Sequence, residues 1–272
     1  MKKLALFLSI AALTGCSSSE VLQTEATTGV TTITIGATPT PAGEVLEYVK
    51  PLLLEQGIYL EIKEFTDYIL PNIAVEEGDL DANFFQHIPY LTDFNENNGT
   101  DIVPVGKVLF APLGIYPGKS TELEELKKGG VEIAIPNDTT NEARALALLE
   151  QLGIIEIDSS AGLSATPKDI ISNPYDVSFI EIEAAQVPRI IQDVDFGVIT
   201  GNYALDGGFT ELVLATEDSQ SEFAILYGNV VATHSSNADN EAIKTLVDIL
   251  QSQVTIDFIN DTYNGAVLSV ID

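Results

Sequence analysis

From residue 31 onward, segments with the pattern of β-strands alternate with segments that have the pattern of amphipathic helices. Residues 31–36 are rich in β-branched side chains and end in glycine, whereas residues 43–56 carry apolar side chains at helical spacing. Further strand-like segments lie at 59–65, 101–116, 131–136, 196–200 and 223–233, and further helix-like segments at 68–77, 121–128, 139–152, 184–192 and 240–250. This alternation predicts an α/β architecture with mainly parallel sheets, because a helix returns the chain before the next parallel strand.

The chain is strongly acidic. Its 41 Asp and Glu residues face 12 Lys and Arg residues, which gives a formal net charge of -29. Nucleic-acid binding requires a basic surface that neutralises phosphates, so this composition argues against nucleic acid as a partner. The acidic residues are spread along the chain and form no tail, a pattern that is typical of a solvated, highly soluble surface.

The first residues have the pattern of an export signal. Two lysines precede an apolar run at 4–13, which is shorter than the ~20 residues that a membrane-spanning helix needs. The run closes with Leu13-Thr14-Gly15-Cys16, which resembles the bacterial lipobox, in which the cysteine is lipid-modified and becomes the new N-terminus. We therefore expect a signal peptide at 1–15 and a lipidated, flexible tether at 16–30. An ordinary signal peptide with an incidental cysteine is the alternative.

Motifs for catalysis, phosphate binding and metal binding are missing or incomplete. The chain has two histidines, no G-x-S-x-G elbow and no H-E-x-x-H zinc helix. Gly118-Lys119-Ser120 lacks the earlier glycine of a P-loop, and Asp79-x-Asp81-x-Asn83 lacks the glycine and glutamate of an EF-hand loop. We therefore expect no enzyme, no metal site and no cofactor.

Residues 83–91 (NFFQHIPYL) concentrate aromatic, amide and imidazole groups in nine positions of an acidic protein. One interpretation is a buried strand end in which His87 is satisfied by hydrogen bonds. The other is a wall of a ligand pocket, since such walls combine apolar faces with a few polar groups. The stretch by itself favours neither.

A second cluster, NDTTNEAR, ends at Arg144 and has the pattern of a helix start. Asp138 or Thr139 can cap this helix, and Asn141 lies three residues before Arg144, on the same helical face. The chain has only one other arginine, and a cation near a helix N-terminus is disfavoured by the helix dipole. A helix start beside a guanidinium makes a receptor for a carboxylate. The cluster therefore indicates a bound anion, with a solvated surface arginine as the ordinary alternative.

Four stretches carry a wider resemblance: 78–87 (GDLDANFFQH), 134–138 (AIPND), 183–186 (EAAQ) and 201–204 (GNYA). In them the sequence resembles the NlpA-type lipoproteins, the methionine-binding components of methionine ABC importers. The first stretch is highly specific to that family, and the other three support the alignment of this sequence with it. The resemblance runs from about residue 31 to the C-terminus.

The resemblance implies a two-lobed fold like that of periplasmic binding proteins, with a hinge and a ligand cleft between the lobes. Lobe 1 is expected at 31–115 plus about 223–272, and lobe 2 at about 116–222 including the hinge crossings. Family members often carry the sequence Pro-Gly-Pro-His-Ala-Glu after the first strand. This chain has PTPAGE at 39–44, so the family histidine is missing there.

The resemblance also implies a ligand site. Arg144 would clamp the ligand carboxylate, while Asn202 and Asn229 would accept hydrogen bonds from the ammonium group. Aromatic side chains would enclose the thioether, because sulfur–aromatic contacts favour methionine over a plain hydrocarbon. The implied site consists of Tyr68, Phe85, His87, Tyr90, Asn141, Arg144, Asn202 and Asn229.

The implied partners are methionine (L or D), the permease and ATPase of an ABC importer, and the membrane, through the lipid on Cys16. The protein would then be exported and would face the outside of the cytoplasmic membrane. Three alternatives remain open from sequence. The ligand is a methionine-containing dipeptide or another apolar amino acid; the protein is an envelope hydrolase, which would need an activated nucleophile; or it is a lipid-anchored interaction module, which would not need Arg144 and the aromatic cluster in one cleft.

Overall fold

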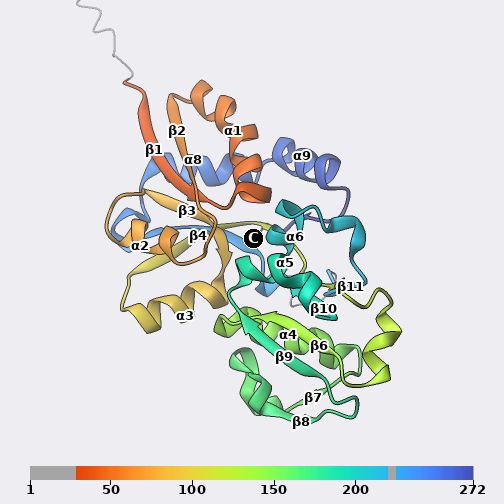
Figure 1. Cartoon of the computed structure of the whole chain (residues 1–272). Coiled ribbons are helices and arrows are strands. Elements are labelled where there is room, and N and C mark those ends of the chain that lie inside the picture. Colours follow the sequence, from red (N-terminus) through yellow and green to blue (C-terminus); the bar gives the residue numbers. More distant parts are fainter. Residues whose placement is uncertain (1–28, 220–224, 272) are drawn as a thin grey trace, which may run out of the picture.

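The computed structural model describes residues 29–219 and 225–271, and its strands form two large sheets (Figure 1). The strand order is β13-β4-β12-β3-β1-β2 in the first sheet and β11-β5-β10-β6-β9 in the second. The predicted signal peptide, Cys16 and most of the tether lie outside the described residues.

The first sheet occupies the upper half of Figure 1, where α1, α8 and α9 pack together at its outer end. Val45, Leu46 and Val49 of α1 meet Ile243 and Leu246 of α8 in the core of this half. The strands are β1 (Thr31–Ala37), β2 (Ile58–Glu64), β3 (Ala82–His87), β4 (Ile102–Phe110), β12 (Asn229–His234) and β13 (Leu268–Ser269). The helices are α1 (Glu44–Glu55), α2 (Leu70–Glu76), α3 (Ile88–Asn98), α8 (Glu241–Leu250) and α9 (Gln253–Tyr263).

The second sheet has a core of its own. Leu146 and Leu149 of α4 pack against Ile133 and Ile135 of β6, because residues three apart on a helix face the same side. The strands are β5 (Gly114–Pro117), β6 (Glu132–Pro136), β9 (Ser178–Ile182), β10 (Phe196–Ile199) and β11 (Ala215–Thr216), with a separate hairpin of β7 (Glu156–Ile157) and β8 (Ile170–Ser172). The helices are α4 (Thr139–Gln151), α5 (Val187–Ile190) and α6 (Gly201–Asp206).

The chain crosses twice between the sheets. It passes from β4 to β5 through residues 111–113 and returns from β11 to β12 by a second crossing, of which the structure describes residues 217–219 and 225–228. The crossings lie side by side, since the amide of Glu217 donates to the carbonyl of Leu113 at 3.1 Å. Gly201 lies close to the first crossing: a Cβ at this position would come within 2.7 Å of the Cβ of Ala111. The limits expected from sequence, 31–115 with about 223–272 for lobe 1 and about 116–222 for lobe 2, stay predictions.

The predicted alternation of strands and helices is confirmed, but the expectation of mainly parallel sheets is wrong. β1 pairs in parallel with β2 and β3, and β6 with β9 and β10. However, β12 runs antiparallel to β3 and β4, and β5 runs antiparallel to β10 and β11. The antiparallel strands flank the crossings. The chain enters β5 and β12 from the other sheet and not through a helix that starts in the same sheet. These two strands therefore need not be parallel to their neighbours.

Two predicted helices are shorter than the sequence pattern indicates. The segment at 121–128 forms a tight 3₁₀ turn at Leu123–Lys128, and the segment at 184–192 contains only α5 between two such turns. Arg189 in α5 is exposed, as expected for a surface helix.

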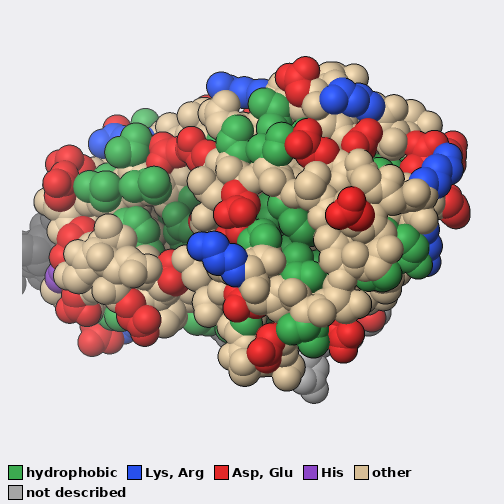
Figure 2. Space-filling view, turned by 60° about the horizontal axis from the view of Figure 1, so that its bottom comes forward, with side chains coloured by type: hydrophobic (Ala, Val, Ile, Leu, Met, Phe, Trp, Pro, Cys, Tyr) green, Lys and Arg blue, Asp and Glu red, His purple; other side chains and the backbone are tan. Residues whose placement is uncertain are grey.

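Acidic side chains are scattered over the face shown in Figure 2 rather than gathered in one patch. This distribution agrees with the solvated surface expected from the composition. Within residues 29–219 and 225–271, no helix combines the length and the apolar character needed to cross a membrane.

Candidate functional site

The end of β3 and the start of α3 place His87 between the two sheets. His87 is the N-cap of α3, where its Nδ1 accepts a hydrogen bond from the amide of Tyr90 at 3.1 Å. Because Nδ1 accepts, the proton of the neutral ring lies on Nε2, which is 3.2 Å from Oδ1 of Asn141 and can donate to it. Burial and the nearby Arg144 guanidinium lower the pKa of His87 to about 3, so the ring is neutral at pH 7.

Three aromatic rings surround the same space. The ring centroid of Tyr68 lies 5.7 Å from that of Phe85 and 5.8 Å from that of Tyr90, and Phe85 and Tyr90 are 6.1 Å apart. The hydroxyl of Tyr90 donates to the carbonyl of Tyr68 at 3.0 Å, which fixes the two rings relative to each other. We call Tyr68, Phe85, His87 and Tyr90 the aromatic wall.

Not every polar residue of the 83–91 stretch belongs to this wall. Asn83, Gln86 and Asn72 form a buried amide network, in which Asn72 Nδ2 donates to Gln86 Oε1 at 2.8 Å and Asn83 Nδ2 donates to Asn72 Oδ1 at 2.8 Å. The two interpretations of the stretch therefore apply to different residues. The side chain of Asn83 is buried and satisfied by hydrogen bonds, whereas Phe85 and His87 face the space between the sheets.

The start of α4 supplies the opposite side. Asp138 caps the helix through Oδ1, which accepts from the backbone amide of Asn141 at 3.1 Å and from its side chain at 2.8 Å. Burial raises the pKa of Asp138. One turn later, Nη1 of Arg144 donates to Oδ1 of Asn141 at 3.0 Å, as their shared helical face predicts. We call Asn141, Arg144 and Asn202 the polar wall.

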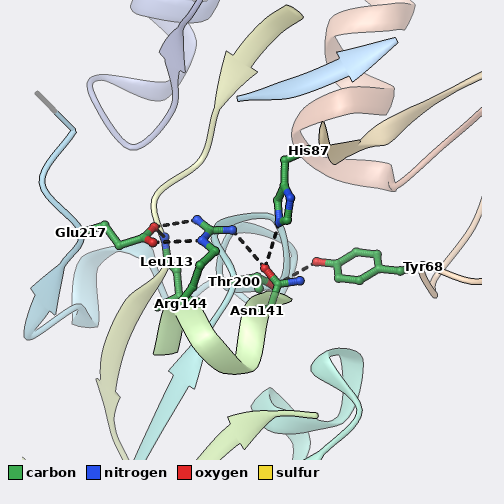
Figure 3. A network of polar contacts seen from close by, with 7 residues as sticks. All are labelled: Tyr68, His87, Leu113, Asn141, Arg144, Thr200 and Glu217. Carbon is green, nitrogen blue, oxygen red and sulfur yellow. Dashed lines mark hydrogen bonds and ion pairs between the residues drawn. The ribbon is translucent and has the colours of Figure 1, made fainter. Parts of the chain in front are cut away.

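Arg144 already has an anionic partner, which the sequence did not reveal. Its Nε donates to Oε1 of Glu217 at 2.9 Å and its Nη2 to Oε2 at 2.6 Å (Figure 3). Its guanidinium carbon also lies 4.3 Å from the ring centroid of Tyr227. Burial alone would lower the pKa of Arg144, but the charge and hydrogen bonds of Glu217 hold it above the usual value. The anion expected at Arg144 is therefore, at least in part, the chain's own carboxylate.

The two asparagines expected to receive an ammonium group come from different halves of the molecule. Asn202 in α6 accepts a hydrogen bond from the hydroxyl of Tyr68 at 2.5 Å, and that hydroxyl is 3.0 Å from Oγ1 of Thr200. Asn229 begins β12, and its Nδ2 donates to the carbonyl of Phe85 at 3.2 Å. This bond leaves Oδ1 of Asn229 as an acceptor.

All eight predicted site residues line one cavity between the sheets. The bonds from Tyr68 to Asn202 and between His87 and Asn141 join its two walls directly. The cavity measures about 20 Å³, room for about one water molecule. Its lining is Tyr68, Phe85, Gln86, His87, Tyr90, Ala111, Asn141, Arg144, Thr200, Gly201, Asn202 and Asn229, with none from residues 39–44.

Arg144 is the one lining side chain that is charged at pH 7, because His87 is neutral and the others are not ionised. The arrangement can therefore hold a carboxylate at one end and apolar groups at the other. In the part of the chain that the structure describes, no group of three or more His, Cys, Asp or Glu side chains is placed to hold a metal ion.

Sequence reasoning missed Glu217 and Tyr227, which hold Arg144, and Thr200, which contacts Tyr68. A general signal for Glu217 does exist, since a buried arginine requires a counterion. That signal could not identify the partner, because the chain offers 41 acidic residues.

Known proteins are similar to this chain over most of its length. The model of the family described as NlpA lipoprotein matches residues 33–271. The D-methionine-binding lipoprotein MetQ of Salmonella typhimurium is 36% identical over 259 residues, which cover 93% of this chain and 91% of the relative.

Solved structures are also similar to this chain over most of its length. A lipoprotein from Ruminococcus gnavus is 46% identical with a TM-score of 0.86, over 88% of this chain and 99% of that one. A nutrient-binding protein from Burkholderia cenocepacia bound to methionine is 37% identical with a TM-score of 0.82, over 87% and 99%. An ABC transporter periplasmic substrate-binding protein from Coxiella burnetii is 36% identical with a TM-score of 0.81, over 88% and 100%. These matches confirm the predicted two-lobed binding-protein fold.

Proposed function

The chain belongs to the NlpA lipoprotein family, and we propose that it is a lipid-anchored substrate-binding protein that captures methionine and delivers it to an ABC importer. One observation carries the proposal: a single buried guanidinium faces an aromatic wall across a narrow cavity. A free amino acid with an apolar side chain has the matching chemistry, with a carboxylate at one end and an apolar group at the other.

The carboxylate of the ligand binds Arg144. A guanidinium has five N–H donors, and the contacts of Arg144 with Glu217 and Asn141 use three of them. The two remaining donors lie on Nη1 and Nη2, where they can form a two-point contact with a carboxylate. The side-chain oxygens of Asn202 and Asn229 accept from the ammonium group.

The thioether lies against the aromatic wall. A sulfur atom about 5 Å from a ring gains roughly 0.3–1.5 kcal/mol over a plain hydrocarbon contact, which favours methionine over an aliphatic amino acid of similar length.

Ligand access requires the walls to separate. The cavity has room for about one water molecule, so the bonds from Tyr68 to Asn202 and from His87 to Asn141 have to open before methionine enters. The described residues of the two crossings, 111–113, 217–219 and 225–228, contain the hinge about which the lobes move, since hinges are a few residues at the ends of elements. Methionine then takes the place of the direct contacts between the walls.

Proteins of this family are exported lipoproteins with a transport role and no catalytic turnover. For this chain we infer that Cys16 carries the lipid, that the protein faces the outside of the cytoplasmic membrane, and that its partners are the permease and ATPase of the importer. Cys16→Ala should leave an unprocessed or released protein. Recovery of the variant in the detergent phase after signal removal would contradict lipid attachment at Cys16.

Native mass spectrometry and calorimetry test the ligand. The purified protein should either carry a mass of one methionine or, after exchange into ligand-free buffer, bind methionine with a stoichiometry of one. Absence of both a retained amino acid and a binding heat for methionine would refute the ligand assignment.

A further inference from the structure

We propose that Glu217 is a specificity-determining residue, which cancels the charge of Arg144 from behind and thereby restricts the cavity to ligands that carry an ammonium group as well as a carboxylate. The inference rests on the proposed function, because it concerns how the same cavity discriminates among carboxylates. It assigns a role to a residue that does not itself line the cavity.

Glu217 and the ligand approach different edges of the guanidinium. Glu217 occupies the edge formed by Nε and Nη2, at 2.9 and 2.6 Å, while Nη1 points to Asn141 on the cavity side (Figure 3). Arg144 lines the small cavity between the walls, whereas Glu217 is absent from that lining. Glu217 instead lines a larger cavity of about 540 Å³ on the far side of Arg144. A ligand carboxylate can therefore reach Arg144 without displacing Glu217.

Glu217 is held in place by the backbone of the first crossing, at Leu113. Its Oε2 accepts from the amide of Leu113 at 2.8 Å, and its own amide donates to the carbonyl of Leu113 at 3.1 Å. Its side chain is 11% exposed, and the ring of Tyr227 covers the guanidinium. The carboxylate is thus a fixed part of the hinge rather than a surface group that turns away when the ligand arrives.

The consequence is a balance of charge. The charges of Arg144 and Glu217 sum to zero, and His87 contributes no charge at pH 7. Asp138, the cap of α4, is a further acidic group close to Asn141, so the surroundings carry no surplus of positive charge. A zwitterionic amino acid adds no net charge to this buried site. A simple carboxylate would add one uncompensated negative charge, which is strongly unfavourable away from water.

The test compares methionine with 4-(methylthio)butanoate, which has the same thioether and carboxylate but no ammonium group. Calorimetry on the full chain in detergent gives both dissociation constants at pH 7, and the informative quantity is their ratio. The parent protein should bind the analogue at least ~100-fold more weakly than methionine, about 2.7 kcal/mol at ~1.4 kcal/mol per decade. In Glu217→Gln, which removes the charge but keeps the shape, this ratio should fall by about tenfold or more, since Arg144 then has a surplus positive charge.

Two control variants separate charge from shape. Glu217→Asp keeps the charge and shortens the side chain, so its ratio should stay near that of the parent even if both ligands bind more weakly. Glu211→Gln makes the same change of net charge at an exposed position and should alter neither constant. A ratio is insensitive to a partly unfolded fraction, because both ligands are titrated into the same preparation.

Four results would overturn the proposal. They are an unchanged ratio in Glu217→Gln with methionine binding no tighter than in the parent, an equal shift in Glu217→Asp, an unchanged ratio in Glu217→Gln with tighter methionine binding, and an affinity of the parent for the analogue within tenfold of its affinity for methionine. The third result would mean that Glu217 competes with the ligand. The fourth is measured on the parent alone and holds even if a variant fails to fold. Failure of the parent to bind methionine would refute the proposed function instead.

Discussion

The aromatic wall and the polar wall enclose the same cavity but are built in different ways. In the aromatic wall, Phe85, His87 and Tyr90 lie within six residues of one another, at the junction of β3 and α3. In the polar wall, Arg144 depends on Glu217, which is 73 residues away in sequence. Apart from Tyr68, which the hydroxyl of Tyr90 contacts, the first wall is a local motif, and its geometry follows from one strand and one helix cap. The second exists only once both crossings are in place.

This difference predicts that the two walls divide the work. The polar wall supplies most of the affinity, because charge-assisted hydrogen bonds are the strong ones. The aromatic wall supplies discrimination among side chains, since contacts of sulfur with rings are individually weak. The following variants test whether affinity and discrimination are separated in this way.

Removal of Arg144 should have the largest effect. Arg144→Ala should weaken methionine binding by roughly two to three orders of magnitude, because hydrogen bonds to charged groups are worth about 1.5–3 kcal/mol each and tenfold corresponds to about 1.4 kcal/mol. Isothermal titration calorimetry measures the loss. Arg189→Ala, at the exposed second arginine, is the control and should bind like the parent.

The same substitution leaves Glu217 buried without its partner, which should destabilise the fold by about 3–5 kcal/mol. The double variant Arg144→Met/Glu217→Gln removes both charges and should recover most of that stability in urea denaturation, yet not the affinity. Equal small losses of affinity in the Arg144 and Arg189 variants would remove Arg144 from the site. Recovery of affinity in the double variant would show that the single variant lost only its fold.

His87 of the aromatic wall should make the free energy of unfolding depend on pH. His87 has a pKa of about 3 in the folded protein, against about 6.5 in an unfolded chain. Between these values the unfolded chain binds a proton that the folded protein does not, so this contribution to stability is complete above pH 6.5 and is lost as the pH falls toward 3. At pH 5 the loss is about 2 kcal/mol, at 1.36 kcal/mol per unit.

His87→Asn isolates this effect, because asparagine can still cap α3. Urea denaturation at pH 7 and pH 5 should show a smaller loss of stability for the variant than for the parent, by about 2 kcal/mol. If the two proteins lose the same stability, His87 is protonated in the folded state and its neutral role at Asn141 is wrong.

Selectivity should show the smallest effect. Phe85→Leu keeps an apolar side chain but removes a ring, so the preference for methionine over norleucine should fall by about two- to twelvefold, the equivalent of roughly 0.3–1.5 kcal/mol. Phe94→Leu is the matched control. Phe94 stacks on Tyr90 with centroids 6.4 Å apart, but it does not line the cavity. A larger change in selectivity for Phe94 than for Phe85 would place the thioether elsewhere.

The contrast between the walls also explains what the sequence could predict. The bounds of α4, Thr139–Gln151, lie within one residue of the predicted helix, because the Asp138 cap and the apolar spacing are local signals. The direction of β12 was not predictable, since periodicity identifies a strand but not its neighbours. Likewise, the eight predicted residues in the cavity lining followed from local stretches and a family resemblance, whereas Glu217 requires the fold.

A crystal structure of the protein with methionine would show which groups hold the ligand. We expect the carboxylate on Nη1 and Nη2 of Arg144, the thioether against Phe85 and Tyr90, and an intact pair between Arg144 and Glu217. Methionine bound in the larger cavity behind Arg144, or a Glu217 side chain displaced by the ligand, would contradict it.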